Sequence, residues 1–105
     1  MGLDVSLRLK NSHTGEIREL DSYRGSDFTF VKEYIDSVDA YGQYIEVTPE
    51  LREKFVNQGL ENLRKYGFDS SDLGEDFGIM GFIKQLHLHE YYARFGYTLM
   101  VEADW

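Results

Sequence analysis

The stretch from Ser70 to Trp105 limits the fold most strongly, because it holds the densest run of apolar and aromatic residues in the chain. Apolar residues recur there at spacings of three and four, which predicts a helix over residues 72–95. The helical projection has apolar residues on two sides, so we expect this helix to be buried on two faces. Gly96 ends the helix, and the alternation of residues 97–101 predicts a final strand.

The N-terminal segment predicts a β-hairpin. Apolar residues occupy every second position from Leu3 to Leu9, as in a strand with one buried face and one solvated face. The run 11–15 is rich in turn-forming residues and ends in a glycine. Residues 16–23 predict a second strand with a weaker pattern, which suits the edge of a sheet.

Residues 28–41 predict an amphipathic helix. Its apolar face is formed by residues spaced three and four apart: Phe28, Val31, Ile35 and Val38. Gly42 supplies the kind of residue that commonly ends a helix in the left-handed conformation. The following piece, 44–47, is compatible with either a brief strand or a simple connector.

A second helix begins at the Thr48-Pro49-Glu50 signal, in which threonine caps, proline fits the first turn and glutamate complements the helix dipole. It ends before Gly67. Its expected inner face is formed by Leu51, Phe55, Leu63 and Tyr66. Gly59 lies on the same face, where a missing side chain would permit a close helix crossing.

These elements together predict one globular α+β domain covering residues 1–105. An N-terminal β-hairpin, two to three helices and a C-terminal strand would form a small antiparallel sheet packed on helices. The 105 residues include no cysteine, no secretory signal and no apolar run long enough to span a bilayer. We therefore expect a cytoplasmic protein that does not associate with membranes.

The chain carries a net charge of −8, and two segments carry the excess acid. No Lys or Arg lies between Lys32 and Arg52, or between Lys65 and Lys84. Such a chain would be repelled by nucleic acid and attracted to basic protein surfaces. An acidic surface that only maintains solubility is the simpler alternative.

His87, His89 and Glu90 are the candidates for metal or acid/base chemistry. In a continuous helix, positions 87 and 89 point about 200° apart, whereas helical metal-binding pairs lie four residues apart. Glu90 and Arg94 do have that spacing, so we expect a local ion pair between them. With no cysteine and no nucleophile motif, the sequence favours a protein without enzymatic activity, cofactor or bound metal.

Tyrosines lie within the first acidic segment, and tyrosine is enriched at protein interfaces. The candidate partner-binding residues are Glu33, Asp36, Asp39, Tyr41, Tyr44, Glu46, Asp69, Asp72, Glu75 and Asp76. Spaced carboxylates on helices can imitate a run of phosphates and speed association with a basic partner.

In size, acidity and lack of catalytic motifs, the chain resembles phage-encoded inhibitors and bacterial immunity proteins as a class. This resemblance implies a non-enzymatic protein that docks on a basic surface of its partner, such as the nucleic-acid-binding groove of a nuclease or defence complex. Two alternatives stay open. One is an enzyme that uses His87, His89 and Glu90, and the other is a homodimer or larger homo-oligomer that pairs through the terminal strand.

Overall fold

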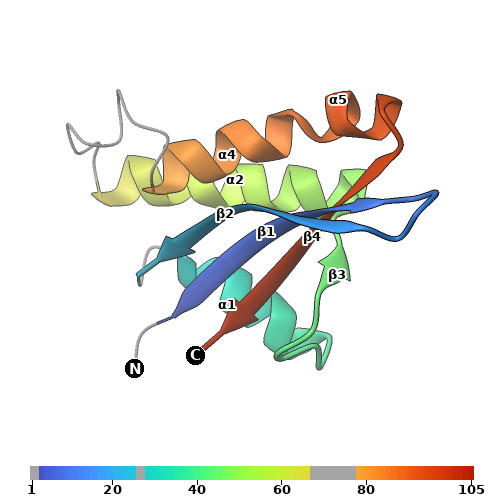
Figure 1. Ribbon diagram of the computed structural model, residues 1–105. Helices are drawn as coiled ribbons and strands as arrows, with labels where there is room; N and C mark the ends of the chain where they lie inside the picture. Colours follow the sequence, from blue (N-terminus) through green and yellow to red (C-terminus); the bar gives the residue numbers. More distant parts are fainter. Residues whose placement is uncertain (1–2, 26–27, 67–77) are drawn as a thin grey trace.

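A computed structural model describes residues 3–25, 28–66 and 78–105 of the chain. Four antiparallel strands form one sheet, and the helices pack on one face of it (Figure 1). The strands, in the spatial order β2-β1-β4-β3, are β1 (Asp4–Asn11), β2 (Ile17–Arg24), β3 (Ile45–Glu46) and β4 (Tyr97–Asp104). The helices of the described ranges are α1 (Thr29–Ser37), α2 (Pro49–Tyr66), α4 (Gly78–His87) and α5 (His89–Arg94). The predicted α+β fold is confirmed.

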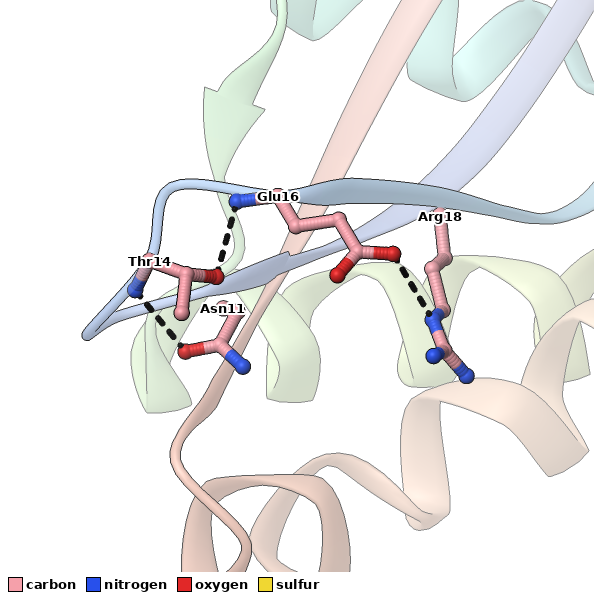
Figure 2. A network of polar contacts seen from close by, with 4 residues as sticks. All are labelled: Asn11, Thr14, Glu16 and Arg18. Atoms are coloured by element: carbon pink, nitrogen blue, oxygen red, sulfur yellow. Dashed lines mark hydrogen bonds and ion pairs between the residues drawn. The ribbon is translucent and has the colours of Figure 1, made fainter.

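The predicted N-terminal hairpin is confirmed, and side chains of its own turn close it. Asn11 accepts a hydrogen bond from the backbone N–H of Thr14 at 3.2 Å, and Thr14 Oγ1 accepts one from the N–H of Glu16 at 3.2 Å (Figure 2). Gly15 adopts a φ of 76°, a conformation that glycine reaches without strain. The second strand, β2, lies at the edge of the sheet, as its weak pattern predicts.

The core lies between the helices and the face of the sheet that carries the alternating apolar residues. Val5, Leu7, Leu99 and Val101 have no exposed surface, which confirms the alternation predicted for both strands. Aromatic rings from the helical layer fill the space opposite them: Phe28, Phe30, Phe55 and Phe82. Burying one such side chain contributes about 1.5–3 kcal/mol, so this cluster is a main source of stability.

Gly59 permits the close helix crossing that its position predicts. A Cβ atom built there would lie 3.2 Å from Ile79 Cγ2 and 3.2 Å from Ile83 Cδ1, both on α4. Ile79 and Ile83 are buried, so they have little room to move away. The glycine therefore permits a separation of α2 and α4 at which any side chain would require Ile79 and Ile83 to shift.

The prediction of a helix from Phe28 to Tyr41 is wrong at its C-terminal end, because α1 ends at Ser37. Asp39 takes the left-handed conformation with a φ of 55°. The N–H of Asp39 then donates to the carbonyl of Asp36, and the N–H of Ala40 donates to that of Ile35. This pair of bonds is a Schellman motif, and it turns Val38 out to solvent instead of into the core.

The prediction of one continuous final helix is also wrong within the described residues. The N–H of Leu88 is shared between the carbonyls of Lys84 and Gln85, and its ψ of 1° lies outside the helical range. This break separates α4 from α5. The predicted start of the helix, residues 72–77, lies outside the described residues.

The last strand, β4, is not a free edge. It pairs along its length with β1 and, at Met100 and Val101, with the short strand β3. The piece 44–47 is thus a brief strand, and it occupies part of the edge through which a second copy was expected to pair. None of the described helices is long and apolar enough to cross a membrane.

Candidate functional site

The first acidic segment forms a compact exposed surface at the end of α1, residues 33–41, which we call the acidic turn. It brings together four of the predicted partner-binding residues: Glu33, Asp36, Asp39 and Tyr41. All four are exposed, and Val38 lies among them with 47% of its surface accessible. The acidic turn therefore presents an exposed apolar side chain that is close in sequence to three exposed carboxylates.

The charges of the acidic turn oppose the dipole of their own helix. The last turn of α1 contains no basic residue, and Asp36 and Asp39 lie at the C-terminal end, where the dipole is negative. Among the ion pairs formed by the described residues, none involves Glu33, Asp36 or Asp39. Asp39 also occupies a left-handed position that glycine or asparagine would fill with less strain.

Tyr41 is fixed against the end of β4. Its hydroxyl oxygen lies 2.7 Å from Asp104 Oδ1 and 2.8 Å from the carbonyl oxygen of Trp105, and these two acceptors share its one proton. The hydrogen bond to Asp104 raises the pKa of Tyr41 above its ordinary value of 10.0, because ionisation would place two negative charges together. Its ring also meets that of Trp105 edge to face. Tyr41 therefore anchors the acidic turn to the sheet while about half of it remains exposed.

Tyr44 and Glu46 are not part of the acidic turn. The guanidinium of Arg8 lies 4.4 Å from the centre of the Tyr44 ring, on the face of the sheet that none of the described helices covers. Burial, followed by the charge of Glu102, raises the pKa of Tyr44 above its ordinary value. Glu46 lies on the short strand β3 and acts electrostatically on His89. The predicted set is thus divided between different surfaces.

The other four predicted partner-binding residues lie outside the described residues: Asp69, Asp72, Glu75 and Asp76.

Two of the candidate catalytic residues, His87 and Glu90, line a polar groove between α2 and the break at Leu88, and His89 does not. The groove has a volume of about 350 Å³ and is lined by Arg52, Glu53, Val56, Asn57, His87 and Glu90. Arg52 Nη1 lies 3.3 Å from His89 Nδ1, and Arg52 Nη2 lies 3.5 Å from Glu90 Oε1. The expected pair of Glu90 with Arg94 is therefore replaced by a contact with α2.

The contacts of Arg52 with His89 and Glu90 join α2 to α5. Burial, and then the positive charge of Arg52, lowers the pKa of His89 below its ordinary value of 6.5. When His89 is neutral, an unprotonated Nδ1 can accept a hydrogen bond from Arg52. The charged ring could not accept it, because both of its nitrogens carry protons. In the described part of the chain, no group of three His, Cys, Asp or Glu side chains is arranged to hold a metal ion.

A second groove, which the sequence did not predict, lies between α5 and the hairpin. It has a volume of about 240 Å³ and is lined by Leu9, Arg18, Tyr91, Tyr92, Phe95 and Tyr97. Tyr91 and Phe95 were expected on a second buried face, but they are 55% and 62% exposed. The sequence signal for this exposure is the small number of residues between Leu88 and Gly96. They leave α5 only six residues long, which is short for a helix that packs against another element.

Comparisons of the chain with protein families, with curated proteins and with solved structures gave no match.

Proposed function

We propose that this chain is a small acidic binding protein without enzymatic activity, and that it docks its acidic turn on a basic surface of a cytoplasmic partner protein. One observation carries the proposal. Two carboxylates that no described cation balances lie at the negative end of α1, and one of them holds a strained backbone conformation. The Schellman motif at the end of α1 requires a left-handed residue at position 39, but it gives no reason for an aspartate there or for a second carboxylate at Asp36.

The cost of the arrangement can be estimated. A carboxylate at a helix C-terminus is unfavourable by about 0.3–1 kcal/mol, and a non-glycine residue in the left-handed conformation costs about 1–2 kcal/mol. Residues that lower stability without a structural benefit commonly mark a functional surface. A cationic partner surface would offset the first cost, because it would supply the positive charge that α1 lacks at this end.

The shape of the acidic turn favours a protein partner over a small cation. Val38 offers an apolar contact at its centre, and Tyr41 is already fixed by Asp104 and Trp105, so little side-chain entropy would be lost on binding. Glu33, Asp36 and Asp39 follow one another at intervals of three residues. Carboxylates repeated in this way suit a groove built to bind phosphates, which supports an inhibitor or immunity-type role towards a nuclease or another nucleic-acid-binding protein.

If the proposal is correct, the carboxylates of the acidic turn lower the free energy of unfolding and raise the affinity for the partner. We expect Asp39→Gly to raise the free energy of unfolding by about 1 kcal/mol, because glycine removes both the strain and the charge. The same variant, and more so the double variant Asp36→Asn with Asp39→Asn, should bind the partner at least about tenfold more weakly. Glu61→Gln on the exposed face of α2 is a matched control that should change neither property.

The partner for this test is obtained by immobilising the full chain and identifying proteins retained from an extract of the source cells. Binding of the purified partner is then measured at increasing salt, where screening should weaken it steeply. Binding that is insensitive to salt, or equal for the double variant and Glu61→Gln, would exclude the acidic turn as the contact surface.

A further inference from the structure

The groove between α5 and the hairpin has a composition that the fold does not require. No residue of α5 is buried, yet Tyr91 on the helix and Phe95 at its C-cap are both exposed, with their ring centres 5.0 Å apart. Tyr92 is oriented by a hydrogen bond from its hydroxyl to Gln85 Oε1 at 2.8 Å. Aromatic rings and arginine are the residues most often found at the energetic centre of protein interfaces.

Arg18 gives the groove its positive charge, and its ion-pair partner can be replaced by another carboxylate. Its Nε donates to Glu16 Oε1 at 3.4 Å, and the two side chains are 64% and 60% exposed (Figure 2). A surface ion pair of this kind contributes only about 0–1 kcal/mol, so an incoming carboxylate can replace Glu16 at little cost. The groove therefore fits an apolar side chain that is accompanied by a carboxylate.

The acidic turn carries that combination of groups. Val38 projects with nearly half of its surface exposed, and Asp36 and Asp39 lie two residues before it and one residue after it. The apolar side chain would enter the aromatic groove, and one of the carboxylates would reach Arg18. The two surfaces are complementary in both charge and polarity.

One molecule cannot bring its own acidic turn to its own groove. Figure 1 shows α5 along the upper side of the molecule and the turn after α1 at its lower side. We therefore propose that the groove receives the acidic turn of a second copy of this chain. The proposal rests on the proposed function in one respect, since the same turn is the contact surface in both.

This contact is heterologous, because it joins two different surfaces of identical chains. Each copy keeps one unused groove and one unused turn, so the contact would extend to longer assemblies unless the rotation closes a ring. The net charge of −8 on each copy opposes association. At about 0.15 M salt, where the screening length is about 8 Å, this general repulsion is weakened while direct ion pairs persist.

The test is sedimentation velocity of the full chain at about 0.15 M salt over a wide range of protein concentration. We expect the average mass to rise with concentration and to pass that of a dimer. Phe95→Ser removes the groove and Val38→Ser removes the apolar side chain of the turn, so each variant alone should remain monomeric. An equimolar mixture of the two should form a one-to-one dimer and no larger species, because it retains one intact groove and one intact turn.

Ile17→Ser is the matched control, since Ile17 is 51% exposed but lines neither surface, and it should associate as the native chain does. Circular dichroism would verify that each variant is folded. A native chain that stays monomeric at all concentrations, variants that still associate, or a mixture that fails to form the dimer would each overturn the proposal.

The same variants separate this proposal from the proposed function. Phe95→Ser should abolish self-association and leave binding to the basic partner intact, because it does not alter the acidic turn. If Phe95→Ser also lost the partner, the acidic turn would not be the docking surface and the proposed function would fail. If self-association were absent while Asp36→Asn with Asp39→Asn still weakened partner binding, only the second-copy proposal would fail.

Discussion

Helices α4 and α5 follow each other in the chain with one residue between them, but they contribute to the molecule in different ways. Half of α4 is buried, including Ile79, Phe82, Ile83 and Leu86, whereas none of the residues of α5 is. Helix α4 crosses α2 at the close contact around Gly59. Helix α5 reaches α2 through polar groups, with Arg52 between His89 and Glu90.

The difference shows that similar apolar content can serve two purposes in adjacent segments. The apolar residues of α4 are spaced to meet both the sheet and α2, so they stabilise the fold. Those of α5 begin after the break at Leu88, where the chain has turned towards the end of the hairpin, and they line an open groove instead. We therefore expect substitutions in α4 to affect folding and substitutions in α5 to affect association.

The largest expected effect compares Phe82 of α4 with Phe95, the residue that caps the C-terminal end of α5. Phe82 is fully buried and its ring contacts those of Tyr23, Phe28 and Phe55, so Phe82→Ala should lower the free energy of unfolding by about 3–5 kcal/mol. Phe95→Ala should change it by less than about 0.5 kcal/mol, because Phe95 is 62% exposed. Chemical denaturation of both variants measures the contrast. Equal losses would remove the distinction between the two helices.

A second, smaller effect tests how closely α4 is held against α2. Gly59→Leu would force side-chain atoms into the space occupied by Ile79 and Ile83, where even a Cβ atom meets neighbours at 3.2 Å. Overpacking of this kind typically costs about 1–3 kcal/mol, which outweighs the better helix propensity of leucine. Glu61→Leu, on the exposed face of the same helix, should not destabilise the protein. An equally stable Gly59→Leu variant would show that α4 can move outwards freely.

The sequence predicts the elements whose residues follow common patterns and misses the points where the chain departs from them. Strand alternation, the Thr48-Pro49-Glu50 signal and a glycine on the inner face of a helix are patterns of this kind, and each led to a correct prediction. The end of α1 was not predicted, because Gly42 offered a plausible stop whereas the chain turns three residues earlier, at Asp39. A left-handed aspartate is uncommon, so no propensity argument would place a helix end there.

The candidate site was predictable in its charge but not in its grouping. Glu33, Asp36, Asp39 and Tyr41 are close in sequence, so a single turn brings them together. Tyr44 follows them closely in the chain, yet it stacks on Arg8 because β3 enters the sheet and exposes alternate residues on the open face. The aromatic groove was not predicted for the same reason, because the pairing of β1 with β4 brings the hairpin beside α5 from the other end of the chain.

The smallest expected effect concerns the polar contact that holds α5 to α2. The pKa of His89 is lowered by burial and by Arg52, against smaller opposing effects of Glu46 and Glu90. A histidine with a lowered folded-state pKa binds fewer protons when folded than when unfolded. Its contribution to stability is therefore complete above its ordinary pKa of 6.5 and decreases as the pH falls below that value towards the folded-state pKa.

We therefore expect the native chain to lose more stability than His89→Gln when the pH is lowered from about 7.5 to about 5.5, because glutamine can still accept from Arg52 but does not titrate in this range. Denaturation at the two pH values measures the difference. Amide hydrogen exchange would then locate it. The amides of α5 should lose protection at the lower pH while those of α4 retain it, because only α5 depends on neutral His89. Simultaneous loss in both helices would mean that they open as one unit, and that the break at Leu88 does not separate two functions.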